Sequence, residues 1–319
     1  MTPAQNKTKT LRLSDKLSER ISLSQLFLLT PKLFEKDYGG ELIAYSFEST
    51  TVDDWYNRFR QRLLDAMGTS YLPVYRMADG EFHFLLWEKI DFNGPDHFIK
   101  LLKYLKHKAI EIALGPRIKT SWGEIYNSKD VFELRRKFIS DLIDLLEIGI
   151  LCAYLYENPK NAYVHYNIPF LKFAEKHSIP LNKHNLYPFH FPFFILSNYG
   201  WQDFISNRKI LIVTGNLAKK KQSLENNLIE LGSKKVEFYE ISSNSSLKDK
   251  LNKDKIDKLS EYEIAFVAAG IGSLNIISQM KWFNGPVIDV GGFLSALQNK
   301  DFLYHGCAVK FPELNLPVI

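Results

Sequence analysis

From residue 208 onward the sequence alternates short apolar runs with helical patterns, and this alternation limits the chain to few folds. Strands separated by helices at this spacing predict a parallel sheet with right-handed crossover connections. The expected fold class is therefore α/β, with a Rossmann-like parallel sheet flanked by helices. The expected strands are Lys209–Thr214, Val236–Ile241, Glu263–Ala269 and Pro286–Val290. Three helices are expected between them: one from about Ala218 to Leu231, a second, charged helix that ends at Ser260, and a third that ends at about Trp282.

Four loops follow these strands, and ligands of a parallel sheet bind beyond the carboxyl ends of its strands. Glycines in such loops let backbone N–H groups approach a phosphate, and the helix starts add partial positive charge. The loops are therefore expected to bind an anionic ligand at one edge of the sheet. Their candidate residues are Gly215, Asn216 and Lys219, then Ser243 and Asn244, then Gly270, Gly272 and Ser273, and finally Asp289 and Gly291.

Two acidic residues follow another expected strand, Leu72–Met77. Asp79 and Glu81 flank Gly80, and in extended backbone residues i and i+2 point the same way, while glycine can take a positive φ. Such a pair suits Mg²⁺ or Mn²⁺, which bind one or two carboxylates together with water and phosphate oxygens. Arg76 is expected to neutralise a phosphate or to hold Glu81. The alternative is an ordinary Asp-Gly turn, because such turns are common.

The remaining sequence patterns predict the domain boundaries. An apolar patch from Ile21 to Phe34 predicts a short helix, so residues 1–50 are expected to form a polar tail and a helical N-terminal arm. Residues 51–319 are expected to form the main domain, with the acidic turn in 51–207 and the Rossmann-like half in 208–319. Other expected elements are helices over Thr51–Met67, Asp96–His107 and Val131–Ile148, strands over Ile110–Leu114 and Gly149–Tyr156, a loop over 121–126, and no regular pattern over 157–199.

Charge and cysteine content narrow the class of partner. The chain has 41 basic and 36 acidic residues, a formal net charge of +5, without the dense basic stripe of a nucleic-acid-binding protein. Phosphorylated small molecules or an anionic lipid surface fit this charge better than nucleic acid does. Only two cysteines occur, which favours a reducing, cytoplasmic setting without a disulfide framework. The polar N-terminus and the lack of a run of 18 apolar residues predict neither a signal peptide nor a transmembrane segment.

Three common nucleotide and hydrolase motifs do not fit the sequence. The Gly215 loop lacks the second glycine of a P-loop, where Lys220 stands, and the Gly270 loop lacks the third glycine of the dinucleotide fingerprint. No Gly-x-Ser-x-Gly elbow occurs, and the histidines between 157 and 199 lack the spacing of a helical metal-ligand pair. These observations argue against a kinase-type P-loop, nicotinamide binding and the usual serine hydrolase.

Five stretches of the sequence form a set, and their motifs are Arg-x-x-Asp-Gly-Glu, a strand ending in Gly-Asn, a loop around Asn244, a Gly-rich loop and Ile-Asp-Val-Gly. The stretches are Arg76–Glu81, Val213–Asn216, Ser242–Ser245, Ala268–Ser273 and Ile288–Gly292. This set resembles the bacterial GT-D type glycosyltransferases over residues 51–300. Met77 and Ala78 replace an aromatic-Gly pair of the family, and Gly292 stands where the family often has His.

The resemblance implies a metal-dependent transferase that moves a sugar from a nucleotide-diphosphate donor, typically a UDP-sugar, to a glycan or glycolipid acceptor in bacterial surface polysaccharide or glycoprotein synthesis. Asp79 and Glu81 would be the catalytic residues, which hold the donor with its Mn²⁺ or Mg²⁺, unless one of them is the base that deprotonates the acceptor. Such an enzyme would be cytoplasmic and peripheral at the inner face of the plasma membrane. The donor would be bound by Arg76, Gly80, Gly215, Asn216, Lys219, Ser243, Asn244, Gly270, Gly272, Ser273 and Asp289.

Two alternatives from other classes stay open at the level of sequence. One is a non-catalytic scaffold that binds nucleotide sugars without turning them over. The other is a different nucleotide-dependent hydrolase on a Rossmann-like fold, which would consume nucleotides that carry no sugar. Binding without turnover would indicate the scaffold, and turnover of sugar-free nucleotides would indicate the hydrolase.

Overall fold

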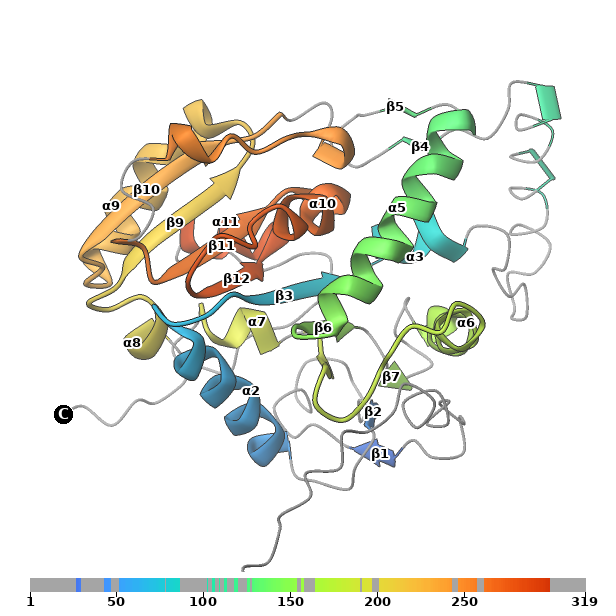
Figure 1. Cartoon of the computed structure of the whole chain (residues 1–319), viewed down its shortest axis with the longest axis horizontal. Helices are drawn as coiled ribbons and strands as arrows, with labels where there is room; N and C mark the ends of the chain where they lie inside the picture. The colour runs from blue at the N-terminus through green and yellow to red at the C-terminus, as the bar shows by residue number, and fades with distance from the viewer. Residues whose placement is uncertain are drawn as a thin grey trace, which may run out of the picture.

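The computed structural model describes one large parallel sheet, its covering helices and several shorter segments (Figure 1). The described residues are 27–29, 43–46, 52–77, 79–86, 102, 105–106, 109, 112–113, 118–119, 125–126, 128–153, 156–157, 164–189, 191–196, 201–242, 246–256 and 261–298.

The core of the fold is a seven-stranded sheet in which all neighbouring strands are parallel. This confirms the α/β fold class that the alternating strands and helices predicted. The strand order is β10-β9-β11-β12-β3-β6-β8. The bounds are β3 (Leu72–Met77), β6 (Ile150–Ala153), β8 (Leu186–Pro188), β9 (Lys209–Thr214), β10 (Lys235–Glu240), β11 (Ile264–Ala268) and β12 (Pro286–Asp289).

Both halves of the expected domain contribute strands to this one sheet. β12 of the second half pairs with β3 of the first, with Pro286 beside Leu72 and Ile288 beside Val74. The chain leaves β9 in one direction to form β10 and then crosses to the other side to form β11 and β12. Connections therefore diverge between β9 and β11, and open α/β sheets form ligand-binding crevices at such points.

Helices cover both faces of the sheet, which explains why its strands read as nearly continuous apolar runs. α5 (Ser128–Leu146) packs against α10 (Ser273–Ser278), whereas α9 (Lys221–Glu230) packs against α11 (Leu294–Gln298). The crossovers that follow β9 and β11 run in opposite directions along the sheet. Because both are right-handed, the two helix pairs lie on opposite faces.

The helix α2 (Val52–Ala66) precedes β3 and confirms the amphipathic helix predicted there. Trp55 and Phe59, one turn apart, are both buried. Their rings contact those of Tyr187 and Phe191, with ring centroids 5.4 to 6.1 Å apart. These aromatic contacts pack α2 against β8, the edge strand of the sheet, and stabilise the fold beyond the burial of apolar area alone.

The prediction of a helical N-terminal arm was wrong for the residues that the structure describes. Phe27–Leu29 and Ile43–Ser46 are strands β1 and β2, which pair antiparallel. β2 also pairs with β7 (Tyr156–Glu157), so these strands form a separate three-stranded sheet. A short apolar run has no clear helical or strand period, so its pairing partner decides its structure. The other residues of the arm lie outside the described part of the chain.

Other predictions for the first half also need correction. Ile112 and Ala113 are helical where a strand was predicted, and β6 ends at Ala153, three residues earlier than predicted. The helix over residues 164–176 was missed because Pro169 lies inside it and interrupts the helical pattern of the sequence. The missed elements include the sheet strand β8, which lies in the 157–199 stretch where no regular pattern was expected, and also β4 (Ile118–Lys119), β5 (Ile125–Tyr126), α6 (Val164–Lys176), α7 (Phe191–Phe194) and α8 (Trp201–Phe204). No helix in the described ranges is long and apolar enough to cross a membrane.

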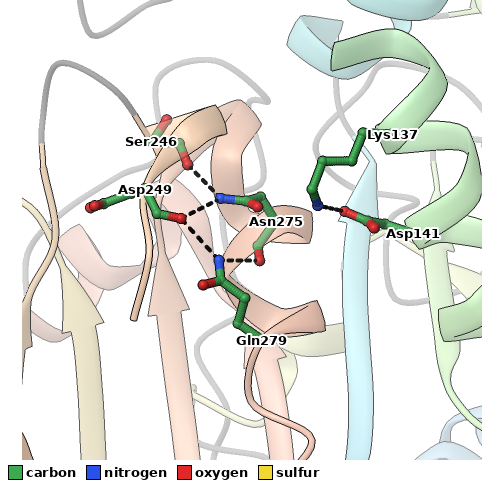
Figure 2. A network of polar contacts seen from close by, with 6 residues as sticks. All are labelled: Lys137, Asp141, Ser246, Asp249, Asn275 and Gln279. Atoms are coloured by element: carbon green, nitrogen blue, oxygen red, sulfur yellow. Dashed lines mark hydrogen bonds and ion pairs between the residues drawn. The ribbon is translucent and has the colours of Figure 1, made fainter. Parts of the chain in front are cut away.

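A charged helix was predicted after β10, but the described residues 246–256 form no α-helix. They contain the 3₁₀ turns η5 (Ser246–Lys248) and η6 (Lys253–Lys255) instead. Asn275 Nδ2 donates to the carbonyl oxygens of Ser246 and Asp249 over 3.0 and 2.9 Å, and Gln279 Nε2 donates to that of Asp249 over 3.0 Å (Figure 2). These side chains satisfy carbonyl groups that a helix would otherwise have to satisfy.

Candidate functional site

The acidic residues predicted at the end of β3 lie at the start of a helix, α3 (Asp79–Leu86). Gly80 has no positive φ, and an added Cβ would meet no atom within 4 Å. Successive helical residues are rotated by about 100°, so residues i and i+2 do not share a direction as they do in a strand. The predicted extended turn was therefore wrong, and Gly80 is not needed for space or for a left-handed backbone.

Glu81 is buried at the carboxyl edge of the sheet, although carboxylates usually remain exposed. Only 6% of this residue is exposed. Its helix α3 contacts both α6 and the 3₁₀ turn η8 (Gly270–Gly272) of the second half. The structure thus brings the acidic helix and one of the glycine loops side by side. The side chain of Asp79 lies outside the described part of the chain.

Tyr75 on β3, a residue that sequence reasoning missed, has a buried hydroxyl that responds to the charge of this carboxylate. Burial raises the pKa of the Tyr75 hydroxyl well above its usual value, and the negative charge of Glu81 raises it further. Within the described residues the Tyr75 hydroxyl has no hydrogen-bond partner. A polar group in a strand that is otherwise buried was the available sequence signal, because such groups usually have a specific partner or role.

Arg76 and Asp289 form a buried ion pair between adjacent strands. Arg76 Nε lies 3.9 Å from Asp289 Oδ2, and their side chains are 7% and 2% exposed. The guanidinium also lies over the rings of Phe189 and Phe293, 4.5 and 4.6 Å from their centroids. Such stacking stabilises a cation and fixes the plane of the guanidinium. Arg76 is therefore engaged within the protein, and its predicted contact with a donor stays a prediction.

The Asp289 carboxyl connects strand β3 with the loops that follow β11 and β12. Burial raises its pKa to about 6, although the charge of Arg76, the Ser273 hydroxyl and the backbone N–H groups of Arg76 and Gly291 all favour the ionised form. Ser273 Oγ in turn accepts a hydrogen bond of 3.2 Å from Ala269 N–H. Asp289 Oδ1 has no hydrogen-bond partner within the described residues. The geometry makes Asp289 a positioning residue for the loops that follow β11 and β12.

Gly291 is required where it stands. Its φ is +45°, and an added Cβ would lie only 1.7 Å from Nη2 of Arg76. The loop after β12 can therefore pass over the guanidinium only because this residue has no side chain. Sequence reasoning assigned this glycine to ligand binding, but the structure shows that it makes room for Arg76.

The loop after β9 is held by two contacts across the sheet. Thr214 Oγ1 donates 3.0 Å to the carbonyl oxygen of Ala268, which joins the ends of β9 and β11. Leu217 N–H, at the start of the 3₁₀ turn η4 (Leu217–Lys219), donates to Glu240 Oε1 over 3.0 Å. The backbone N–H at the start of this turn is thus already bound by a carboxylate. Two predicted site residues remain exposed on this loop: Asn216, with a left-handed φ of 56°, and Lys219.

The remaining loop residues have clear structural roles or lie outside the description. Gly270 has a left-handed φ of +55°. An added Cβ at Gly272 would lie 2.5 Å from Ser246, so this glycine permits close packing of η8 on η5. Gly215 is buried, and Ser243 and Asn244 lie outside the described residues. The structure therefore gathers the loops after β9, β11 and β12 at one edge, together with the start of α3.

The residues of this edge fit a divalent cation in part. No group of three or more His, Cys, Asp or Glu side chains is positioned for a metal within the described part of the chain. A Mg²⁺ or Mn²⁺ ion that binds together with a diphosphate needs only one or two carboxylates, because phosphate oxygens and water complete its shell. Glu81, a buried residue on the helix α3 that contacts η8, would supply one such carboxylate. The predicted metal site stays a prediction.

Three comparisons with known proteins complete the description of the site. Searches against family models, curated proteins and solved structures found no match in any of the three. The α/β fold therefore rests on the parallel sheet itself. The resemblance to GT-D type glycosyltransferases rests on the sequence motifs alone.

Proposed function

We propose that the chain is a metal-dependent glycosyltransferase that moves a sugar from a nucleotide-diphosphate donor, a UDP-sugar, to a glycan or glycolipid acceptor. The observation that carries this proposal is the contact between α3, which bears Glu81, and the glycine turn Gly270–Gly272 at the carboxyl edge of one sheet. A carboxylate and a glycine-rich turn at such an edge suit a cation and the diphosphate that it accompanies.

Residues at the carboxyl edge of the sheet would have separate roles in this reaction. Asp79, Glu81 or both would hold the cation, which when bound would supply positive charge beside the departing diphosphate. Lys219, exposed on the loop after β9, adds positive charge on the same edge. Arg76 and Asp289 position the floor of the site through their buried pair. If only one of these two acids holds the cation, the other would take the proton of the acceptor hydroxyl.

The test compares Glu81→Gln with a matched control, Glu175→Gln, which alters an exposed glutamate on α6. UDP-sugars are screened by thermal shift with and without Mn²⁺, since a ligand that binds only the folded state raises the melting temperature. We expect Mn²⁺-dependent stabilisation by a UDP-sugar, sugar transfer by the parent protein, and a loss of about 100-fold or more in Glu81→Gln. The control should keep the parent rate.

Other outcomes would contradict the proposal in distinct ways. Donor binding without any turnover would indicate the scaffold. Consumption of nucleotides without sugar would indicate the hydrolase. Full transfer activity in both Glu81→Gln and Asp79→Asn would show that these acids do not form the site.

A further inference from the structure

Glu240, the last residue of β10, lies beside the loop that follows β9. The two strands are neighbours in the sheet (Figure 1), and their register places Glu240 opposite Thr214, the last residue of β9. Oε1 of Glu240 accepts a hydrogen bond of 3.0 Å from Leu217 N–H. Glu240 is exposed, although Leu217 is buried. The loop thus orients an acidic side chain at the carboxyl edge of the sheet and leaves it accessible to a ligand.

The chemistry of this carboxylate limits what it can bind. An ionised carboxylate only accepts hydrogen bonds, and its two oxygens together can accept about four. Within the described residues Glu240 accepts only the hydrogen bond from Leu217. Two adjacent hydroxyl groups fit such a group, because each can donate to a carboxylate oxygen and the bonds are strengthened by its charge. The expected ligand group is therefore a diol.

The place of Glu240 in the sheet favours the diol of a ribose. Connections diverge on the two sides of β9, and β10 is its neighbour on one side. In parallel sheets that bind nucleotides at such a point, an acidic residue about 20 positions after the glycine loop hydrogen-bonds the ribose. Glu240 follows Gly215 by roughly 25 positions and ends the strand next to β9.

A half-buried lysine on the same turn indicates that the ligand is also an anion. Lys220 N–H donates over 2.9 Å to the carbonyl oxygen of Leu217, so Lys220 and Glu240 are bonded to opposite ends of one residue of η4. Burial lowers the pKa of the Lys220 ammonium, and no carboxylate in the described ranges offsets this effect. A phosphate group would supply the compensating charge. An acceptor for hydroxyl groups and a cation on one turn suit a phosphorylated ribose.

We propose that Glu240 recognises the ribose hydroxyl groups of a ribonucleoside diphosphate and so selects it over the 2′-deoxy form. This inference rests on the proposed function, since both require a nucleotide, but it concerns binding and needs no transfer of sugar. A site that hydrogen-bonds a hydroxyl group discriminates against the analogue that lacks it, because the protein acceptor then has no partner.

The experiment measures dissociation constants of the full chain by isothermal titration calorimetry in the presence of Mn²⁺. ADP, GDP, CDP and UDP are each compared with their 2′-deoxy forms, and none of them carries a sugar besides its pentose. We expect the parent to bind its preferred ribo form about tenfold or more tightly than the deoxy form. Glu240→Ala should reduce this ratio to about one. Glu240→Gln keeps a neutral acceptor for Leu217 N–H, and its ratio should be about three.

The ratio of the two dissociation constants separates recognition from damage to the loop, because a distorted loop weakens the binding of both forms alike. The control variant is Glu230→Ala. The helix α9 leads from the carboxyl edge of β9 back to the start of β10, so the exposed Glu230 at its end lies near the opposite edge of the sheet. This variant should keep the parental affinities. Circular dichroism should show that all three variants fold, and Glu240→Gln still gives the test if Glu240→Ala does not.

The outcomes for this inference and for the proposed function are distinct. Equal affinity of the parent for ribo and deoxy forms, or a tenfold ratio that persists in the Glu240 variants, would overturn the inference. Ribose selection without sugar transfer would support the inference and contradict the transferase. Sugar transfer with no ribose selection would do the reverse. Absence of any nucleotide binding would contradict both.

Discussion

Nε of Arg76 lies 3.9 Å from Oδ2 of Asp289, and this buried pair joins the two neighbouring strands that connect the halves of the chain. Burying two charges costs free energy that their attraction only partly recovers, so such a pair need not stabilise the fold in net terms. Removing one partner is different, because it leaves the other charge buried and uncompensated. Several consequences of this arrangement can be measured.

Arg76→Met should lower the free energy of unfolding by about 3 to 5 kcal/mol, measured by urea denaturation, because Asp289 would lose its cation. The matched control is Arg60→Met. Arg60 Nε lies 2.7 Å from Asp203 Oδ2, but these side chains are 34% and 28% exposed. The control should therefore lose no more than about 1 kcal/mol. Equal losses in the two variants would show that the buried pair has no special role.

Stability should depend on pH through Asp289. Its pKa is raised from 3.8 to about 6, so the folded state binds the proton more tightly than the unfolded state does. The contribution of this carboxyl to the free energy of unfolding is fully present below pH 3.8 and is lost as pH rises through about 6. The total change is on the order of 3 kcal/mol.

Urea denaturation of the parent and of Asp289→Asn between pH 4 and 7 isolates this effect, because other titrating groups are common to both. The parent should lose stability relative to the variant as pH rises across that window. Parallel curves for the two proteins would show that Asp289 titrates in the folded state as it does in the unfolded chain.

Gly291→Ala should destabilise the fold by about 2 to 4 kcal/mol, because the new methyl group would collide with Arg76 and the backbone φ is positive. Gly80→Ala is the informative partner. Gly80 lies in a helix with open space around its Cα, so alanine there should stabilise the fold by up to about 1 kcal/mol. Thermal unfolding distinguishes the two signs. A stabilising Gly291→Ala would mean that the loop over Arg76 has room to move.

Asn275→Ala should destabilise the segment that contains η5. It removes both hydrogen bonds from Asn275 to the carbonyl oxygens of Ser246 and Asp249, at a cost of about 1 to 3 kcal/mol. Hydrogen exchange of residues 246–251 should accelerate. Asn226→Ala removes an exposed side chain that accepts from Gln222, and it should leave exchange in that segment unchanged. Acceleration in both variants would indicate a general loss of stability.

The second half of the fold was predictable because its signals are local. β9 has the predicted bounds of Lys209–Thr214, and the other three strands of this half differ from prediction by a residue or so at their ends. Buried parallel strands require continuous apolar runs, and the helices between them require an apolar face. Both patterns can therefore be recognised within short stretches of the sequence. The convergence of the loops after β9, β11 and β12 follows from that topology alone.

The residues that build the floor of the site could not be predicted because their roles depend on contacts between distant segments. A buried arginine signals that a partner exists, but nothing local identifies Asp289, Phe189 or Phe293 as that partner. Likewise, the 246–256 segment has a helical composition, and its irregular course depends on hydrogen bonds from distant residues such as Asn275 and Gln279.

The pairing of β3 with β12 also bears on how the protein is made. Val74 and Ile288 are neighbours in the sheet, yet the ribosome synthesises one long before the other. Until translation reaches β12, the nascent β3 presents unpaired backbone groups that could associate with other chains. We therefore expect the first half, when expressed alone, to aggregate, and the complete polypeptide to fold slowly because its central strands meet last.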